Sequence, residues 1–398
     1  MKILQVANKF PYPAKDGGAI ATLSLSRSFA AQGHAVTVLA MNTSKHFTDI
    51  SRVPEDLNAK IRLIGVPVNT DIRILPLVRN FLFSRLPYNA ERFVDTRFRN
   101  ALEDLLKSES FDIIQLEGLY LAPYLEAIRK FSSARVVMRA HNIEHEIWER
   151  SIAGHAGIRK LYIASLARRI RRMELEFLNK YDAVVPITER DYLVLQKLGC
   201  RLPAHVVPMG VNPDELVPDF SRMEFPSVFH IGALDWMPNQ EGLTWFLEKV
   251  WEKVLKHHPD LKFYLAGRNA PDHFKSLTYP NVSYLGEVAD AYDFIRSKTV
   301  MIVPILSGSG MRIKIIEGMA LGKAIVTTTI GTEGIATTSG ENLFVADDPD
   351  EFAQIVCNLV ENREKCVAIG ENARKFVTEY YDNDVITRSL ILFYEKLK

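Results

Sequence analysis

The chain has 398 residues, which is beyond the size at which a single hydrophobic core keeps growing, so we expect two or three domains. A hydrophobic fraction of 47% and a charged fraction of 24% are typical of a folded globular protein and exclude collagen-like, disordered and coiled-coil chains. With 49 basic and 48 acidic residues and no reader motif, nucleic acid is not an expected partner.

The charge balance differs on the two sides of residue 208. Residues 1–208 contain 30 Lys and Arg against 21 Asp and Glu, whereas the remainder contains 19 against 27. This asymmetry favours two bodies with different partners, although two solvated faces that happen to differ would produce the same pattern.

The cysteines and the apolar runs indicate in which cellular compartment the protein is expected. Cys200, Cys357 and Cys366 are odd in number and form no CxxC, so we expect neither a disulfide framework nor a zinc knuckle, and a reducing cytoplasm. The opening apolar run, residues 1–7, breaks too early for a signal peptide. No window of about 18 uninterrupted apolar residues occurs, so we expect no membrane span.

The first half alternates short apolar or β-branched runs with helical stretches. After the first run comes a loop that ends in Gly17 and Gly18, and then a helix over 20–31, which together with the next run predicts a βαβ unit. Continuous apolar runs are typical of a mostly parallel sheet covered on both faces. The expected strands are residues 3–7, 35–40, 61–66, 113–116, 135–139 and 183–187.

The same alternation restarts at residue 227 and predicts a second α/β domain. Pro and Gly in residues 206–212 favour a linker and hinge, so we place the domains at 1–208 and 209–380. The amphipathic helix in 381–398 must bury its apolar face, and we expect it to pack back on the first domain. The expected strands here are 227–231, 262–266, 282–285, 300–303 and 324–327, with helices over 243–255 and 313–321.

Two glycine-containing loops are candidate ligand sites. At Gly17 and Gly18, a backbone without side chains would let a phosphate or a sugar hydroxyl reach a helix N-terminus, although a plain tight turn is the alternative. Residues 305–322 are more informative, because a strand leads through Gly308, Ser309 and Gly310 into a helix start.

That helix start carries two cations and a carboxylate. Arg312 and Lys314 could neutralise a diphosphate, and Glu317, about one turn further, could accept hydrogen bonds from ribose hydroxyls. The alternative is a capped helix with an exposed pair between Lys314 and Glu317.

This segment and several others resemble retaining glycosyltransferases of family four, over nearly the whole chain. The resemblance rests on the order and spacing of the opening strand and glycine loop, FDII at 111–114, His141 at a strand end, VPMGVN at 207–212, HIG at 230–232, LAG at 265–267, LG at 285–286 and EGMALG at 317–322.

The resemblance implies an α/β chain of the GT-B fold, with two facing Rossmann-like domains and a cleft between them. It implies a metal-independent enzyme that moves a hexose from a nucleotide diphosphate sugar, of UDP or GDP type, to a glycan or lipid-linked acceptor in polysaccharide or glycoconjugate synthesis. The donor would bind the second domain and the acceptor the first. His141 would face the donor sugar; Gly232, Arg268 and Val288 would lie at the donor, and Glu117 and Glu144 at the acceptor.

The chain departs from the family pattern at two places. The residue eight positions before Glu317 is Ser309, where a carboxylate is usual, which bears on the identity of the donor sugar. The family's usual Arg and Lys are also absent after the first strand of the second domain, where the loop reads ALDWMPN, residues 233–239. A subgroup with a WxPN loop and a GxGxRxKxxE helix start is similar, and Arg312 and Lys314 would act as the replacements.

Other activities remain open from the sequence. A non-catalytic protein of the same fold that binds sugar nucleotides or glycans, or a nucleotide-sugar epimerase, would fit the same pattern. His141 and His145 with Glu144 do not form HExxH, and the DxD strings at 348–350 and 382–384 lie outside strand ends. We therefore expect no metal and no cofactor.

A basic and apolar stretch, residues 73–99, has six arginines and only two acids, and four more arginines follow at 168–172. Such helices are typical of membrane surfaces or anionic ligands, so we expect peripheral contact at the inner face of the cell membrane. A solvated face or an ordinary core helix is the alternative.

Overall fold

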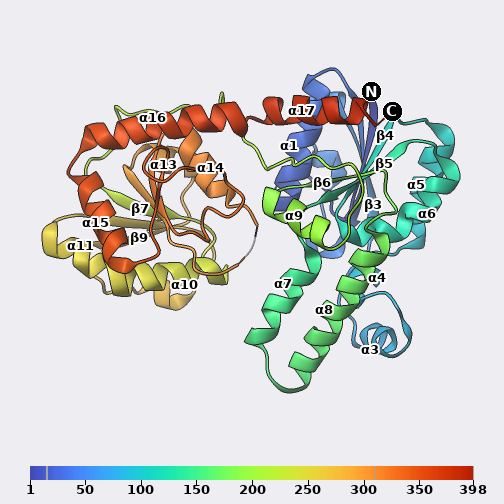
Figure 1. The fold of residues 1–398 in the computed structure, drawn as a ribbon, viewed down its shortest axis with the longest axis horizontal. Coiled ribbons are helices and arrows are strands. Elements are labelled where there is room, and N and C mark those ends of the chain that lie inside the picture. Colours follow the sequence, from blue (N-terminus) through green and yellow to red (C-terminus); the bar gives the residue numbers. More distant parts are fainter. Residues whose placement is uncertain (15–16, 309, 398) are drawn as a thin grey trace. The chain divides into compact units, whose positions relative to one another are not determined.

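The computed structural model describes residues 1–14, 17–308 and 310–397, and it divides the chain into two units. Unit 1 comprises Met1–Pro208 and Ile386–Lys398, and unit 2 comprises Met209–Val385 (Figure 1). Each unit contains a six-stranded parallel sheet covered by helices, as expected from the alternation of apolar runs in the sequence. Within the described residues, no helix has the length and apolar character needed to cross a membrane.

The sheet of unit 1 has the strand order β3-β2-β1-β4-β5-β6, and every neighbouring pair is parallel. All six strands predicted in the first half are confirmed, and β2 extends three residues further than expected. Their bounds are β1 Lys2–Ala7, β2 Ala35–Thr43, β3 Ile61–Val68, β4 Ile113–Glu117, β5 Arg135–Ala140 and β6 Ala183–Pro186.

Helices bury both faces of this sheet, because successive strand residues point to opposite sides. Ile3 belongs to a core cluster with α1 and α17, and Leu4 belongs to one with α5, α6 and α8. The helices of unit 1 are α1 Gly17–Ala31, α2 Glu55–Lys60, α3 Ile74–Phe83, α4 Tyr88–Glu91, α5 Thr96–Ser108, α6 Leu125–Phe131, α7 Glu144–Ser151, α8 Gly157–Phe177, α9 Glu189–Lys197 and, from Ile386 onward, α17 Asn383–Glu395.

The last helix, α17, completes the core of unit 1. Tyr394 is fully buried, stacks on Phe29 with ring centroids 6.2 Å apart, and donates a hydrogen bond to Gln115 of β4. The Oγ of Ser389 lies 2.7 Å from Nε2 of His205, a residue that follows β6 in the chain. The apolar face that the sequence left without a partner is therefore buried in unit 1.

The sheet of unit 2 has the order β12-β11-β10-β7-β8-β9. Five of its strands were predicted, and the two-residue β12 was not. The strands are β7 Val228–Ile231, β8 Phe263–Ala266, β9 Val282–Gly286, β10 Val300–Val303, β11 Ala324–Thr327 and β12 Phe344–Val345, and the helices are α10 Met237–Trp245, α11 Glu252–His257, α12 Asp272–Lys275, α13 Ala291–Arg296, α14 Ile313–Ala320, α15 Pro349–Val360 and α16 Arg363–Tyr380.

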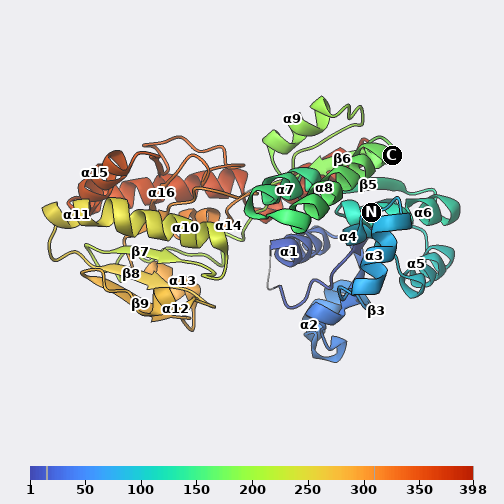
Figure 2. The same ribbon diagram turned by 90° about the horizontal axis from the view of Figure 1, so that it is seen from below.

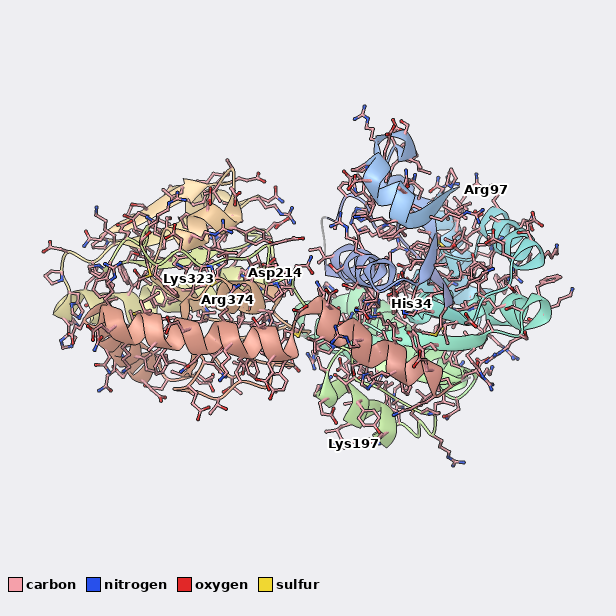
Figure 3. All side chains as sticks on the ribbon, turned by 90° about the horizontal axis from the view of Figure 1, so that it is seen from above. His34, Arg97, Lys197, Asp214, Lys323 and Arg374 are labelled. Carbon is pink, nitrogen blue, oxygen red and sulfur yellow. The ribbon has the colours of Figure 1, made fainter. Side chains whose placement is uncertain are left out.

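Two buried or partly buried cations tie the segments of unit 2 together, and both are labelled in Figure 3. Arg374 of α16 donates to the carbonyl oxygens of Pro213 at 3.1 Å and Ala320 at 2.7 Å. Lys323 is fully buried and donates to the carbonyls of Arg296 and Lys298, and burial lowers its pKa to about 8. These bonds fix the end of α14, whose beginning carries the candidate site.

The helix predicted over 243–255 begins earlier than expected. α10 starts at Met237, with Trp236 preceding it and Pro238 in its first turn, and a π-helical turn at Phe246–Trp251 joins it to α11. Gly242 allows α10 to lie directly against the chain leaving β10, because a Cβ at this position would fall 1.5 Å from the carbonyl oxygen of Pro304. This close approach brings the start of α10 beside the loop that leads to α14.

Candidate active site

The candidate donor site of unit 2 lies where β10 and β7 are neighbours in the sheet. The strand order reverses direction there, and the carboxyl end of a parallel sheet at such a point is the usual place for a ligand. The loop after β7 leads to α10, and the loop after β10 leads to α14. Both loops supply polar side chains to a single cluster.

Lys314, in the first turn of α14, is the centre of this cluster. Its Nζ donates a hydrogen bond to Asn239 Oδ1 at 2.9 Å and lies 3.5 Å from His230 Nε2. Gly232 leaves room for the ammonium group, since a Cβ there would lie 2.6 Å from Nζ. Burial and the charge of Arg312 lower the pKa of Lys314 to about 7.

His230 and Asn239 hold this lysine, and neither was identified from the sequence as a site residue. His230 Nδ1 bonds the carbonyl oxygen of Ile302 at 2.9 Å, so Nδ1 carries the proton and Nε2 is an acceptor facing Lys314. Burial and the nearby lysine lower the pKa of His230 well below its usual range, and the ring is neutral. Asn239 donates from Nδ2 to the carbonyl of Ala233 at 2.8 Å, which fixes Oδ1 toward Lys314.

Arg312 precedes the first residue of α14 and is buried. Its guanidinium carbon lies 5.3 Å from the centroid of the Trp236 ring, and Nη1 donates to the carbonyl of Gly310. Gly308 has a φ of +96°, and a Cβ there would be 3.5 Å from both Arg312 and Trp236. Ser309, which the sequence analysis also assigned to this loop, lies outside the described residues.

Glu317 lies one helical turn beyond Lys314, as the spacing predicts. Tyr292 of α13 donates to its Oε1 at 3.0 Å. Burial raises the pKa of Glu317, while the tyrosine hydroxyl and Lys314 act in the opposite direction. Two other predicted donor residues follow neighbouring strands: Arg268 is exposed after β8, and Val288 packs against the core after β9.

In unit 1, His141 follows β5 and is held by Glu117 at the end of β4. Their Nε2 and Oε2 atoms are 2.7 Å apart. Glu117 also accepts a hydrogen bond from Gln5 at 3.0 Å, and the Arg139 guanidinium lies 3.7 Å from its Oε2. Burial alone would raise the pKa of Glu117, but Arg139 and the His141 hydrogen bond lower it to about 2.

Glu117 supports His141 from below, and its predicted contact with an acceptor stays a prediction. Its carboxylate is buried and surrounded by the side chains of Gln5, Gln115, Arg139 and His141. The paired register of Glu117 and Arg139 on adjacent strands produces this arrangement. Glu117 orients His141, while contact of His141 with a donor sugar stays a prediction.

Glu144 belongs to a separate polar cluster between α7 and α8, which lie side by side in Figures 1 and 2. Its backbone N–H donates to Glu174 Oε1 at 3.1 Å, and His145 Nδ1 bonds the other oxygen of Glu174. Burial raises the pKa of Glu144 to about 7; a hydrogen bond with Tyr120 opposes this shift and the charge of Glu174 adds to it. Acceptor contact by Glu144 stays a prediction.

The glycine loop predicted before the first helix is corrected in one respect. Gly17 and Gly18 are the first residues of α1, which begins three residues earlier than expected, and both are exposed. They therefore contribute to the N-terminal turn itself. Ligand binding at this turn stays a prediction.

A metal site would need several His, Cys, Asp or Glu side chains close together. In the part of the chain that the structure describes, no group of three or more His, Cys, Asp and Glu side chains could hold a metal ion. The first aspartate of each DxD string accepts a backbone hydrogen bond: Asp348 caps α15, and Asp382 accepts from the N–H of Asp384. Both strings thus have a local structural role.

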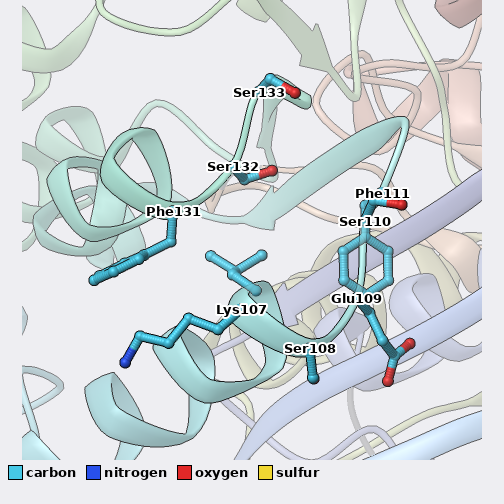
Figure 4. A pocket seen from close by; sticks show the side chains of 9 residues that line it. Lys107, Ser108, Glu109, Ser110, Phe111, Phe131, Ser132 and Ser133 are labelled. Carbon is cyan, nitrogen blue, oxygen red and sulfur yellow. The ribbon is translucent and has the colours of Figure 1, made fainter.

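A small cavity of about 250 Å³ in unit 1 has no place in this chemistry (Figure 4). Its lining includes Lys107, Glu109 and Ser132, from the segments that precede β4 and β5. It therefore lies at the amino ends of the strands, opposite the edge at which such sheets bind ligands.

Comparisons with known proteins agree with this geometry. A family model described as Glycosyltransferase Family 4 matches residues 15–215, and one described as Glycosyl transferases group 1 matches residues 225–362. A 44.6 kDa protein in the cps region of Klebsiella pneumoniae is 24% identical over 98% of both chains. Phosphatidyl-myo-inositol mannosyltransferase of Mycobacterium tuberculosis is 26% identical over 48% of this chain and 53% of its own.

Solved structures share the fold over the full length. Sucrose-phosphate synthase from Thermosynechococcus elongatus has a TM-score of 0.74 at 15% identity and covers 100% of this chain and 99% of its own. Anabaena HepE in complex with UDP has a TM-score of 0.66 at 15% identity and covers 100% of both chains. The two six-stranded sheets described above are therefore arranged as in these proteins within each unit.

The pKa of Glu144 makes stability depend on pH. Its value of about 7 in the folded chain lies above the ordinary 4.5, so this carboxyl stabilises the fold at low pH and the benefit is lost as the pH rises from 4.5 through 7. The free energy of unfolding is measured with urea for Glu144→Gln and for the wild type. We expect the difference between the two proteins to shift in favour of the variant by on the order of 2 kcal/mol when the pH is raised from 5 to 8.5.

Glu149→Gln, at an exposed position on the same helix, is the matched control and should not show this gain. A stability difference for Glu144→Gln that is the same at both pH values would contradict the assignment.

Proposed function

Because the chain belongs to glycosyltransferase family 4 and is a glycosyltransferase of the GT-B fold, we propose that it transfers a hexose, with retained configuration, from a UDP or GDP sugar to a glycan or lipid-linked acceptor. The observation that carries this proposal is the pair of cations at the start of α14, the buried Arg312 and the half-buried Lys314, whose charge is partly desolvated. Anabaena HepE, which has the same fold, has been solved with UDP and with UDP-glucose, which supports a nucleotide-sugar donor.

The cation pair suits a leaving diphosphate. Lys314 is enclosed by the neutral groups of Asn239 and His230, so its charge is poorly compensated and an anion would stabilise it. Arg312 can bind two phosphate oxygens at once, and the helix start adds backbone amides. We propose that these groups stabilise the charge that develops on the diphosphate, without a metal or other cofactor.

Glu317 is placed to bind the ribose. Its raised pKa and its hydrogen bond from Tyr292 leave a carboxyl group that can accept a further hydroxyl, one turn along the helix from the cations. The separation of roles along α14, phosphate at the start and ribose a turn later, matches the order of groups in a nucleoside diphosphate.

The acceptor belongs, in this proposal, to polysaccharide or glycoconjugate synthesis. The Klebsiella relative is described by its place in a cps region, and the mycobacterial relative by an inositol lipid as its substrate. Both support an acceptor that is a growing glycan or is attached to a lipid.

Unit 1 also has a surface suited to a membrane. α3 is attached to α8 through Arg169, which donates to the carbonyls of Ser84 and Leu86, and through Phe81, whose ring centroid is 6.0 Å from that of Tyr162. Most of its other apolar side chains are exposed to solvent, with Leu75 84% exposed. We propose that α3 lies on the inner face of the cell membrane, with Arg79 and Arg85 near anionic lipid headgroups.

The first expected outcome concerns Arg312. Arg312→Ala should lower turnover by about 10² to 10³, because a group that stabilises leaving-group charge is removed, and Arg312→Lys should recover part of it. Transfer is measured with a panel of UDP and GDP hexoses, and circular dichroism monitors the fold. Arg222→Ala, an exposed arginine of unit 2, should leave the rate unchanged. A normal rate in Arg312→Ala would reject this site.

A second outcome concerns the protonation of Lys314. At pH 8 its amine is mostly neutral, since its pKa is about 7, and a bound diphosphate will raise that pKa. Binding of UDP or GDP should therefore take up as much as about one proton, measured by calorimetry in two buffers of different ionisation enthalpy. Lys314→Met should remove this uptake; tight binding by the wild type without proton uptake would contradict contact between Lys314 and the diphosphate.

The membrane contact is tested by sedimentation with vesicles. Replacing Arg79 and Arg85 by Gln should weaken binding to anionic vesicles by about 30-fold, because each basic residue contributes ~1 kcal/mol. Leu75→Ser with Phe83→Ser should weaken binding through lost apolar contact. Lys197→Gln on α9, labelled in Figure 3, is the control. Binding that is insensitive to anionic lipid and to both double variants would exclude the proposed surface.

A further inference from the structure

Unit 1 contains a second and larger cavity, of about 770 Å³, that the donor chemistry does not use. It lies at the carboxyl ends of β1, β2 and β3, the edge at which a parallel sheet binds ligands. Its lining residues follow the ends of these three strands and include Lys9, Lys45, Asp71 and Arg92.

The charges around this cavity are mostly positive. Lys9, Lys45 and Arg92 line it together with one carboxylate, Asp71, which accepts a hydrogen bond from Ser44 at 2.7 Å. Burial and the charge of Lys45 lower the pKa of Lys9. Burial and both lysines lower the pKa of His46. Cations crowded in this way are stabilised by an anion.

Arg92 is held in place at the wall of the cavity. Its Nη1 donates to the carbonyl of Thr70 at 3.2 Å, and its guanidinium lies 5.3 Å from the centroid of the Phe93 ring. Its Nε is buried and has no hydrogen-bond partner among the described residues. The guanidinium is thus held by protein contacts, and its positive charge lies at the wall of the cavity.

The cavity continues into the apolar surface of α3. Ile72 lines it and is exposed, and α3 begins two residues later. Tyr88 fixes this junction, because its hydroxyl accepts from the N–H of Arg73 at 3.1 Å and donates to the carbonyl of the same residue at 3.3 Å. A cationic cavity therefore adjoins the helix that presents Ile74 and Leu75 to solvent.

We infer that this cavity binds the phosphate or diphosphate group of the acceptor, and that the acceptor's apolar chain lies along α3. This inference rests on the proposed function and narrows its acceptor class from glycans and lipid-linked glycans to phosphate-bearing lipids. The same phosphate chemistry would also accept a phosphorylated sugar, and the apolar surface of α3 favours the lipid.

The test measures binding of three probes, inorganic pyrophosphate, dodecyl phosphate and glucose 6-phosphate, by calorimetry. The protein carries Arg312→Ala and Lys314→Met in all cases, so that phosphate does not bind the donor site of unit 2. We expect dodecyl phosphate to bind more tightly than the other two probes. Lys45→Gln and Arg92→Gln should each weaken pyrophosphate and dodecyl phosphate about tenfold, because each removes a charged hydrogen-bond donor.

Lys107→Gln, at the cavity of Figure 4, is the matched control and should leave all three affinities unchanged. Arg92→Lys, which keeps the charge, guards against a folding defect and should retain most of the pyrophosphate affinity. If neither Lys45→Gln nor Arg92→Gln changed the affinities, the cavity assignment would be overturned. If glucose 6-phosphate bound more tightly than dodecyl phosphate, the assignment of a lipid as the acceptor would be overturned.

The two proposals fail separately. With otherwise wild-type protein, UDP or GDP binding should not change in Lys45→Gln, because that residue lies in unit 1. Loss of nucleotide binding or of transfer by the wild type would reject the proposed function, whereas intact transfer with no phosphate binding at the cavity would reject only the inference.

Discussion

The ammonium group of Lys314 is desolvated enough that its pKa falls to about 7, and the residues around it are arranged to hold it in this place. Gly232 has no side chain to occupy its place, His230 is kept neutral, and the amide of Asn239 is turned toward it. Gly242 contributes from a distance, because the close contact of α10 with Pro304 brings Asn239 to the lysine. A buried charge is costly unless such partners are present, so these residues depend on one another.

Unit 1 contains a buried anion, which is stabilised by surrounding side chains in a similar way. The Glu117 carboxylate is neutralised by Arg139 and hydrogen-bonded by Gln5, Gln115 and His141, all on strands or strand ends of one sheet. Arg139 in turn donates to the carbonyl of Ala21 in α1. In both units a rigid parallel sheet thus holds the polar side chains, and the groups that face a ligand are positioned by others that do not.

The sequence was sufficient for every strand of the two sheets except β12, and for the positions of the residues at the start of α14, and the reasons are local. Buried strands are continuous apolar runs, and the positions of Arg312, Lys314 and Glu317 follow from helix periodicity once the helix start is recognised. His230 and Asn239 could not be found in this way, because they meet Lys314 only through packing of segments more than 70 residues apart. The burial of the Glu117 carboxylate has the same origin, because Gln5 and Arg139 reach it from the neighbouring strands. β12 was missed because two residues carry too little periodicity.

The return of α17 to unit 1 has a consequence for the order of events on the ribosome. Tyr394 donates to Gln115, and Gln115 donates to the Glu117 carboxylate that orients His141, so the polar network beneath this histidine is completed by a residue close to the end of the chain. N-terminal domains generally fold first during synthesis. Here the core of unit 1 is completed only by a helix that is translated after unit 2, and until then Phe29 of α1 lacks the ring of Tyr394 that covers it. Chaperone contact with the nascent chain would be most useful in that interval, after unit 2 has appeared and before α17 has docked.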